Sequence, residues 1–533
     1  MTDRKLLTDA INLTMHGKYK EAEQIYKNLL ENDADDYMLL SAIGLFYVST
    51  KSYYEAKKYL KRASEINPSL GTISALGFAY YENGEFEEAA KILTDVLKYG
   101  ENPDIYDKII MSYFKLNQFK LAVKYSEIMY EKYPHETASV ANMVKALTQS
   151  GKLFEAEKLC VGYLKEHNDS GALWIHLGFL KELIYSDDKQ ACKCFKIASD
   201  LGHFEAIYNM AVSYQKQGDY ENAEINYKKM LEINPDDKEA LTSYGMCLLK
   251  QKKFQEGYEL YFKRDKSALD KNLNNKWTPN QAFEKTVMVI SDQGYGDHIN
   301  FARYLPFLKA KTEKVIVTVR KQLRELFENN YPDLKFISYE EINPEIQSIR
   351  ITDLPYALGM DFNNIPFGEG YLKAPIANIK SNKLKVGLCW EAGGAGIRTM
   401  INRTVHVKNF DPIFNLENIQ LYSFQVDDTF NGNEIYKDKL INLAKDFKSF
   451  EDTAEAVNAM DLIVTVDTSV AHLSGALGKK TLLLLPYVTD WRWFDDTKTT
   501  PWYNSVEIFK QVDPISWEKP IEDIICKINE YCL

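Results

Sequence analysis

Apolar and polar positions in the first half of the chain follow a pattern that returns several times. The tract GKYKEAEQIYKNLLENDADD has near copies in KSYYEAKKYLKRASEINPSL, GEFEEAAKILTDVLKYGENP, GKLFEAEKLCVGYLKEHNDS and GDYENAEINYKKMLEINPDD. A small residue recurs in this pattern at a spacing of about 34 residues. Its positions are Ala22, Ala56, Ala89, Ala122, Ala156, Ala191, Ala223 and Gly257. The regular spacing predicts an array in which each copy forms two antiparallel helices.

This spacing is typical of a tetratricopeptide repeat (TPR). We expect small residues such as Gly44 and Ala56 to lie where the two helices of a repeat cross, because bulk there would push them apart. Pro68 and Pro235 separate repeats, since proline cannot continue a helix. The pattern predicts an all-α TPR solenoid of about eight helical hairpins over residues 1–262, whose concave surface suits a protein or peptide partner.

From about Lys285 the pattern changes to short β-branched runs that alternate with helical segments and Gly-rich turns. The strand-like runs are TVMVI, KVIVTV, KFISY, KVGLCW, IQLYSFQ, DLIVTVD and KTLLLLP. This alternation predicts parallel sheets covered by helices. Because the order of strand, glycine turn and helix starts twice, we expect a linker at 263–284 and two Rossmann-like halves at 285–378 and 379–533, with a cleft between them.

Composition and charge narrow the class of function. The 533-residue chain has a formal net charge of −11, which disfavours a nucleic-acid partner but leaves nucleotide binding open. The N-terminus lacks the apolar core of a signal peptide, and no run approaches the roughly 20 apolar residues of a membrane span. We therefore expect a cytoplasmic protein. Its seven cysteines are scattered and odd in number, so we expect reduced structural thiols.

Three segments of the second half are candidates for the wall of a binding site. They are Gln293–Asp297, Trp390–Arg403, and Asp467–Ser469 together with His472, and each follows a predicted strand. In sheets of this kind ligands bind beyond the carboxyl ends of the strands. We therefore expect the three segments to face one cleft.

The text around these segments resembles the heptosyltransferase-like glycosyltransferases of the GT-B fold, and above all the bacterial branch that carries TPR repeats in front. The matching stretches are QGYGDHINFARYLPFL, VGLCWEAG with NRTV, DLIVTVDTSVAHLSGALGKKTLLLLPYVTDWRWF, TPWYNSVEIFKQ and FQEGYELYFKR. The resemblance spans nearly the whole chain, and Asp461–Trp493 is its most specific part. It implies inverting transfer of a sugar from a nucleotide-sugar substrate, with no cofactor and no bound metal. The second half has no Asp-x-Asp sequence after Lys285, which disfavours the metal-dependent GT-A class.

Asp297 is the general base that the resemblance implies. It ends a turn that contains Gly294 and Gly296, which we place in the donor site, and its position at a helix start suits it to accept a proton in a cleft. The structural alternative is an N-cap that only satisfies helix amides.

We expect the donor site in the second Rossmann-like half. The helix that begins near Ser469 directs backbone N–H groups and its positive dipole end toward the cleft, which favours an anion. Thr468 and Ser469 can add hydroxyl donors to a diphosphate. His472 either donates to a phosphate or sugar oxygen or is structural, and Asp467 orients the loop or binds sugar hydroxyls.

Arginine and tryptophan residues complete the predicted donor site. Arg398 and Arg403 follow a Gly-rich turn, where a guanidinium could neutralise the leaving diphosphate in place of a metal. Arg403 is the preferred residue for this role because its NRTV sequence matches the family. The alternative for Arg398 is a solvent-exposed charge with no role in binding. Trp390 either walls the site or fills the core. Arg492 lies where family members shape the donor pocket. The stretch EAGGAGIRTMI departs from the family, so the donor stays open.

Two classes of function follow. In the first, the chain is a glycosyltransferase that moves a sugar to a Ser or Thr hydroxyl of a protein held by the solenoid, such as flagellin or another surface protein. A variant uses an envelope saccharide as acceptor, with the solenoid docking a partner enzyme. In the second, the chain is a non-catalytic TPR adaptor whose second half is a decayed nucleotide-binding module. Retention of Asp297, Asp467 and His472 disfavours the adaptor.

Overall fold

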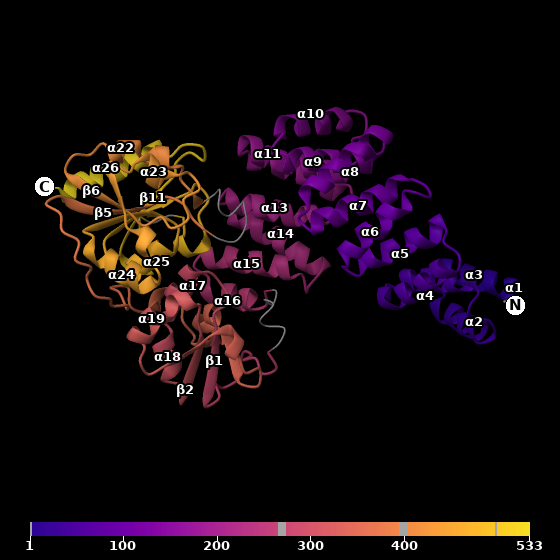
Figure 1. Ribbon diagram of the computed structural model, residues 1–533, viewed down its shortest axis with the longest axis horizontal. Helices are drawn as coiled ribbons and strands as arrows, with labels where there is room; N and C mark the ends of the chain where they lie inside the picture. Colours follow the sequence, from indigo (N-terminus) through magenta and orange to yellow (C-terminus); the bar gives the residue numbers. More distant parts are fainter. Residues whose placement is uncertain (1–2, 265–272, 394–402, 496–497, 533) are drawn as a thin grey trace. The chain divides into compact units, whose positions relative to one another are not determined.

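The structure is a computed structural model that describes residues 3–264, 273–393, 403–495 and 498–532 (Figure 1). By their internal contacts the residues form two compact units, Met1–Gln217 and Gly218–Leu533. In the part of the chain that the structure describes, no helix is long and apolar enough to cross a membrane.

The first unit consists of helices that follow one another at the spacing of the repeat. They are α1 (Arg4–Met15), α2 (Tyr19–Asn32), α3 (Tyr37–Ser49), α4 (Tyr53–Ile66), α5 (Leu70–Glu82), α6 (Phe86–Val96), α7 (Pro103–Lys115), α8 (Phe119–Lys132), α9 (Thr137–Gln149), α10 (Leu153–Leu164), α11 (Gly171–Tyr185), α12 (Asp188–Asp200) and α13 (Glu205–Lys216). Each odd-numbered helix from α1 to α11 packs on the even-numbered helix that follows it. The structure therefore confirms the predicted helical pairs in this unit.

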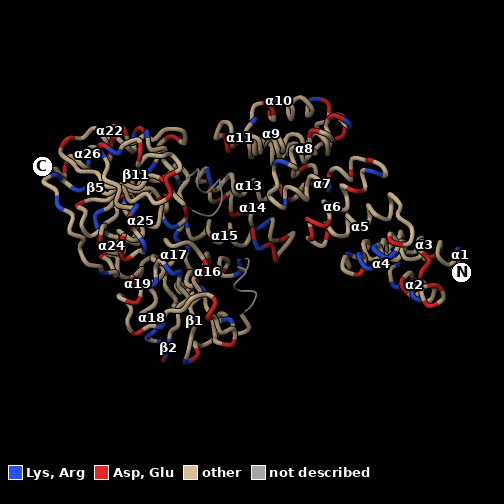
Figure 2. The backbone as a smooth tube through the Cα atoms, in the orientation of Figure 1, with Lys and Arg blue, Asp and Glu red and all other residues tan. Residues whose placement is uncertain are grey.

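Small residues lie where the helices of a pair cross, as the repeat predicted. Ala22 and Ala56 are fully buried. A Cβ added to Gly44 of α3 would lie 2.4 Å from the Cγ atom of Leu60 in α4, which is too close for any real contact. Larger side chains at these positions would separate the helices. Acidic and basic residues are interspersed along these helices, and neither sign forms a continuous run (Figure 2).

The second unit opens with three further helices and continues into two sheets. The helices are α14 (Tyr220–Ile233), α15 (Lys238–Lys250) and α16 (Phe254–Phe262). The first sheet, as far as the chain is described, has four parallel strands in the order β3-β2-β1-β4. Its elements are β1 (Thr286–Ile290), α17 (Tyr295–Ala302), α18 (Leu305–Lys309), β2 (Lys314–Thr318), α19 (Lys321–Asn330), β3 (Lys335–Ile337), β4 (Gln347–Arg350) and α20 (Leu354–Ala357).

The second sheet has seven strands within the described residues, in the order β10-β11-β9-β8-β5-β6-β7. All neighbouring strands are parallel except the pair β10 and β11. Its elements are β5 (Leu384–Cys389), α22 (Asp411–Phe414), β6 (Ile419–Ser423), α23 (Gly432–Ile435), β7 (Leu440–Asn442), α24 (Phe450–Ala459), β8 (Leu462–Val466), α25 (Ser469–Ala476), β9 (Thr481–Leu485), β10 (Thr499–Thr500), β11 (Tyr503–Lys510) and α26 (Glu518–Tyr531). The expected parallel sheets with covering helices are therefore present.

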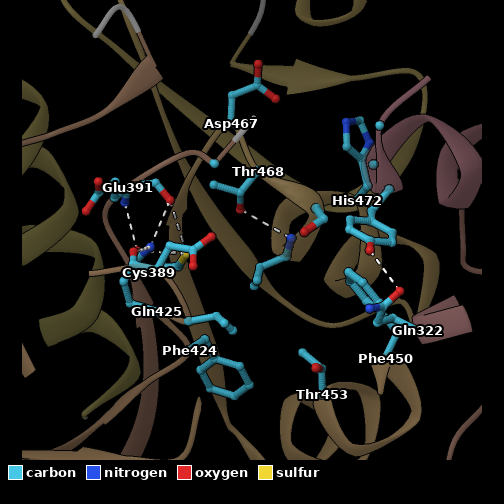
Figure 3. A pocket seen from close by; sticks show the side chains of 18 of the residues that line it. Gln322, Cys389, Glu391, Phe424, Gln425, Phe450, Thr453, Asp467, Thr468 and His472 are labelled. Atoms are coloured by element: carbon cyan, nitrogen blue, oxygen red, sulfur yellow. Dashed lines mark hydrogen bonds between the residues drawn. The ribbon is translucent and has the colours of Figure 1, made fainter. Parts of the chain in front are cut away.

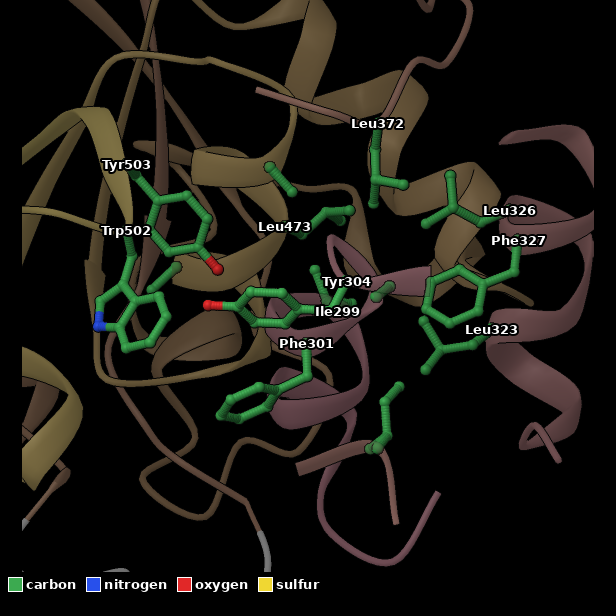
Figure 4. Packing of buried hydrophobic residues seen from close by; sticks show 14 of the residues in the cluster. Ile299, Phe301, Tyr304, Leu323, Leu326, Phe327, Leu372, Leu473, Trp502 and Tyr503 are labelled. Atoms are coloured by element: carbon green, nitrogen blue, oxygen red, sulfur yellow. The ribbon is translucent and has the colours of Figure 1, made fainter. Parts of the chain in front are cut away.

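One continuous apolar core joins both sheets, and aromatic side chains from the two halves meet in it (Figure 4). Tyr304, which follows α17, lies among residues of the first half, and Trp502 and Tyr503 approach it from the second half. Arg303 is fully buried here, and its guanidinium donates to the carbonyl oxygens of Pro366 at 3.1 Å and Trp502 at 2.8 Å. These contacts tie the end of α17 to the start of β11 in the second sheet.

The same core takes in the hairpin α15–α16. Phe254 of α16 lies 6.3 Å from the ring of Trp502, and Tyr258 lies 6.1 Å from Trp491. Lys250 of α15, which is 3% exposed, donates to the carbonyl oxygen of Thr489 at 2.7 Å. The sequence pattern changes near residue 262, but the compact unit starts at Gly218, because these last helices pack on the sheets.

Candidate functional site

A cavity of about 500 Å³ opens at the carboxyl ends of both sheets (Figure 3). Its wall is built from the segments that follow β1, β2, β5, β6, β8 and β9. The predicted residues that line it are Gly294, Gly296, Asp297, Arg403, Asp467, Thr468, Ser469, His472 and Arg492. The structure thus brings the described residues of all three predicted segments to one place, beyond the strand ends as expected for parallel sheets.

Asp297 lies in the first turn of α17, whose N-cap is Gly294, and its partner is an arginine from the other half. The Oδ1 atom of Asp297 lies 2.5 Å from the Nη2 atom of Arg492. Burial raises the pKa of the Asp297 carboxyl, while the nearby Arg492 guanidinium opposes that rise. The carboxylate is therefore held by an ion pair on the cavity wall and does not occupy the N-cap position.

Arg492 is held between two carboxylates. Its Nη1 atom lies 2.9 Å from Oδ1 of Asp490, and its backbone N–H donates to the same oxygen at 3.0 Å. Burial alone would lower the pKa of the guanidinium, but Asp297 and Asp490 raise it well above its usual value. The Nε atom of Arg492 is buried and finds no hydrogen-bond partner among the described residues. The side chain thus retains one unused donor.

The N-terminus of α25 also contributes to the wall. Thr468 is its N-cap, and the Oγ1 atom accepts from the N–H of Val470 at 3.2 Å and lies 3.0 Å from the Oγ1 atom of Thr465. Ser469 is the first helical residue and lines the cavity. The Thr468 hydroxyl therefore shapes the loop, and the helix end presents a partial positive charge to the cavity.

Asp467 and Arg403 form the second ion pair of the cavity. The Nη1 atom of Arg403 donates to Oδ2 of Asp467 at 3.2 Å, and Asp467 is 4% exposed. Burial raises the pKa of the Asp467 carboxyl, and Arg403 opposes the rise. The Nε atom of Arg403 is buried without a hydrogen-bond partner in the described parts of the chain. Arg398 lies outside the described residues.

His472 is neutral and points its Nδ1 atom away from solvent. This atom lies 3.0 Å from the hydroxyl of Tyr503, which donates to Oδ1 of Asn300 at 3.1 Å. Because the Tyr503 hydroxyl has one proton, His472 Nδ1–H is the donor in the first contact, which leaves Nε2 as an acceptor. Burial lowers the pKa of His472 to about 3. In this arrangement His472 can accept a hydrogen bond but carries no charge for a phosphate.

Gly296 is required by packing between the two halves. A Cβ at this position would lie 2.7 Å from Cδ2 of His472, so any larger residue would separate α17 from α25. Gly294 differs, because a Cβ there would meet only Oδ2 of Asp297, at 3.8 Å. Of the two glycines, only Gly296 brings the halves into close contact.

Trp390 does not line the cavity, so its prediction as a donor-binding residue is wrong. It is fully buried and belongs to the core on the other face of the second sheet. Side chains alternate between the faces of a strand, so Cys389 and Glu391 reach the cavity while Trp390 points away. Trp491 and Trp493 are also buried, and Trp493 stacks on His472 with ring centres 5.0 Å apart.

Several cavity residues were absent from the sequence prediction. Gln425, after β6, accepts from the backbone N–H groups of Trp390 and Glu391 at 3.1 and 2.9 Å. Glu391 in turn accepts from the N–H of Thr429 at 2.9 Å. An apolar wall is formed by four aromatic side chains from three segments, which follow β1, β6 and β7. These are Tyr295, Phe424, Phe447 and Phe450. Tyr295 and Glu391 lie within two of the predicted segments but were not singled out there. No local motif marks Gln425, Phe424, Phe447 or Phe450, and only their position after strand ends could have indicated them.

The cavity carboxylates are not arranged as a metal site. Across the described ranges, no three His, Cys, Asp or Glu side chains are grouped so that they could hold a metal ion. Asp297, Asp467 and Asp490 instead pair with arginines.

Comparisons with known proteins identify the repeats. A tetratricopeptide-repeat family model matches residues 204–237, and a model of subunit 3 of the anaphase-promoting complex (cyclosome) matches residues 15–96. The predicted TPR repeats in the N-terminal region are thereby confirmed. The solved structure of a tetratricopeptide repeat protein from Parabacteroides merdae matches with a TM-score of 0.42 and 14% sequence identity. The match covers 46% of this chain and 98% of the Parabacteroides chain.

Two curated proteins are similar in sequence. Protein FlbA of Caulobacter vibrioides is 21% identical over 542 residues, which covers 91% of this chain and 88% of FlbA. The anaphase-promoting complex subunit CDC16 of Saccharomyces cerevisiae is 24% identical over 242 residues, covering 44% of this chain and 26% of CDC16. The similarity to FlbA therefore extends through both the repeats and the sheets.

Proposed function

We propose that this chain is a glycosyltransferase of the GT-B type, which moves a sugar from a nucleotide-diphosphate sugar to a hydroxyl of a protein acceptor. One observation carries the proposal. A cavity large enough for an activated sugar lies at the carboxyl ends of two parallel sheets, with the Asp297 carboxylate on one wall and the N-terminus of α25 on the other. A carboxylate that can accept a proton and a helix N-terminus that can bind an anion are the two parts that such a transfer needs.

The donor diphosphate is proposed to bind at the N-terminus of α25. Ser469 can donate from its backbone N–H and hydroxyl, and Arg403 and Arg492 carry the positive charge that a departing diphosphate requires. The aromatic wall at Phe424 and Phe450 offers an apolar surface to the remainder of the donor. This placement leaves the reactive carbon on the side of Asp297.

Asp297 is proposed as the general base. It takes the proton of the acceptor hydroxyl while that oxygen forms a bond to the anomeric carbon. The bond from this carbon to the diphosphate oxygen breaks, and the nucleoside diphosphate leaves with the bonding electron pair. Because the hydroxyl attacks opposite the leaving group, the sugar configuration inverts. His472 can accept a hydrogen bond from a sugar hydroxyl through Nε2.

The helical repeats are proposed to hold the acceptor. Stacked helical pairs present an extended surface that suits a chain better than a small molecule. A Ser or Thr of a surface protein is the acceptor that this arrangement favours.

The test is a screen of nucleotide sugars with the full-length protein, measuring release of the nucleoside diphosphate and mass shifts of candidate acceptor proteins. Wild-type protein is expected to turn over at least one donor, and Asp297→Asn is expected to lose turnover while still binding nucleotide. If no donor is consumed but a protein is bound through residues 1–217, the chain is a repeat adaptor and the proposal fails.

A further inference from the structure

Three arginines line the cavity, and the two that come from the second half, Arg403 and Arg492, are each paired with a carboxylate before any ligand arrives. Arg492 pairs with Asp297 and Asp490, and Arg403 pairs with Asp467. A diphosphate at the N-terminus of α25 would bring at least two negative charges beside these two guanidiniums, whereas Arg320, after β2, donates to the carbonyl oxygen of Gln293 at 3.2 Å. A diphosphate that binds through the terminal nitrogens of Arg403 or Arg492 therefore competes with a carboxylate for that arginine.

We propose that the Asp297–Arg492 ion pair is the one exchanged: an entering diphosphate takes Arg492, and the Asp297 carboxylate becomes free only when the donor is bound. This inference rests on the proposed function, since it makes the availability of the base depend on the donor. Without donor, Arg492 blocks Asp297 from an acceptor hydroxyl. With donor, the same guanidinium stabilises the leaving group.

The geometry of Arg492 favours this exchange. Asp490 holds the residue from its own segment, through both Nη1 and the backbone N–H, so the arginine stays in the cavity when Asp297 is released. The flanking Trp491 and Trp493 are buried, and their packing fixes the backbone. A small rotation of the Arg492 guanidinium is therefore enough to release Asp297. The Nε atom of Arg492, which is buried and unpaired in the described structure, then becomes available to a phosphate oxygen.

Arg403 is less suited to control the base. Its side chain is 30% exposed, against 13% for Arg492, and its partner is Asp467 rather than the proposed base. A diphosphate at Arg403 alone would leave the Asp297–Arg492 pair intact.

Loss of the arginine would also make Asp297 a stronger base. Arg492 is the group that lowers the pKa of this carboxyl, whereas burial and the carboxylates of Asp490, Asp292 and Asp467 all raise it. When Arg492 turns to a phosphate, only the raising influences remain, and the pKa of Asp297 increases. The exchange thus couples donor binding to proton abstraction.

The first experiment measures binding of inorganic pyrophosphate to the full chain by calorimetry. Because Asp297 competes with the anion for Arg492, Asp297→Asn is expected to tighten pyrophosphate binding by about tenfold. The double variant Asp297→Asn/Arg492→Met is expected to lose that gain. Equal affinity in wild type and Asp297→Asn would overturn the inference, as would a gain that survives Arg492→Met.

Glu391→Gln is the matched control. Glu391 is a buried carboxylate of the same cavity, 4% exposed, but it bonds to Thr429 and, among the described residues, has no ion pair with an arginine. Its neutralisation reports the general effect of removing one negative charge, and is expected to change the pyrophosphate affinity by less than about threefold. If Glu391→Gln tightens binding as much as Asp297→Asn, the gain is only electrostatic and the exchange is wrong.

A crystal structure of wild-type protein with pyrophosphate gives an independent test, which also serves if a variant fails to fold. The expected result is Arg492 bonded to a phosphate oxygen and separated from Asp297. A bound anion with the ion pair intact, or no pyrophosphate binding at millimolar concentration, refutes the exchange. The proposed function fails differently, by absence of donor turnover, and neither binding result depends on turnover.

Discussion

The helices of the first unit and the wall of the cavity bury different kinds of side chain. In the first unit the helix crossings are filled by Ala and Gly, and ion pairs such as Lys196–Asp200 lie on the surface, with side chains 70% and 66% exposed. In the cavity, ionised side chains from opposite halves are buried against one another, as in Asp297–Arg492. Packing of the repeats therefore depends on neighbours in sequence, whereas the cavity depends on contacts between distant segments.

The hairpin α15–α16 belongs to the first region by sequence and to the second by packing. Its repeat pattern continues from the solenoid, yet Lys250 and Phe254 contact residues near the cavity wall. A helical repeat can therefore also become part of a neighbouring apolar core when one of its faces packs on an apolar surface.

The largest effect is expected from removing the carboxylate of Asp297. Asp297→Asn should lower donor turnover by about 10²- to 10⁴-fold, because the amide cannot accept the acceptor proton. The matched change Asp200→Asn in the first unit, where the carboxylate is exposed, should leave turnover unchanged. Steady-state release of nucleoside diphosphate measures both. Normal turnover in Asp297→Asn would remove this residue as the base and weaken the contrast between the regions.

The next largest effect concerns Lys250. This side chain is 3% exposed and lies 3.2 Å from Asp495, whose side chain is 21% exposed, so Lys250→Ala leaves a partly buried carboxylate with fewer partners and empties a buried site. We expect a loss of about 3 kcal/mol in the free energy of unfolding. Lys196→Ala, in an exposed pair, should change it by less than about 0.5 kcal/mol. Urea denaturation of the full chain followed by tryptophan fluorescence measures both, and equal losses would contradict the proposed integration of α15.

A smaller effect is expected at a helix crossing of the repeats. Gly44→Ala places a Cβ 2.4 Å from Leu60 and should cost about 1 to 3 kcal/mol. Gly162→Ala in α10 is the control, because nothing lies within 4 Å of a Cβ there. It should stabilise the chain by about 0.5 kcal/mol, since alanine favours the helix. Thermal denaturation of the two variants measures both changes, and equal effects of Gly44→Ala and Gly162→Ala would contradict the role of close packing at Gly44.

The smallest effect is expected from pH. His298 is fully buried, and burial lowers its pKa to about 4, while an unfolded histidine titrates near 6.5. As pH falls below about 6.5 the unfolded chain binds the extra proton, so stability decreases from pH 7 to pH 5. His298→Gln should reduce this decrease by about 1 kcal/mol. Urea denaturation of the wild type and the variant at both pH values measures this decrease. The same decrease in both proteins would mean that His298 titrates normally in the fold.

Much of the fold could be predicted because its signals are local. The repeat spacing located the helices, and the β-branched runs located β1, β2, β5, β6, β8 and β9. Short strands such as β4 (Gln347–Arg350) were missed, because their residues are polar and only pairing with a neighbour makes them strands. The start of the compact second unit at Gly218 was not predicted either, because it depends on packing between the helices and the sheets.

The candidate site was predicted in part. Asp297, Thr468, Ser469 and His472 follow strands closely in the sequence, and this position together with the resemblance to GT-B glycosyltransferases indicated them. Trp390 was assigned to the wrong place because the position of a strand end in the sequence does not show to which face of the sheet a side chain points.

The sequence by itself determined the helical repeats, the two sheets and the segments that reach the strand ends, because spacing and side-chain type act along the chain. Only the tertiary structure decided that Arg492 meets Asp297, that Arg403 meets Asp467 and that His472 is neutral. Burial and opposing charge set these properties, and both are contributed by residues far away in sequence.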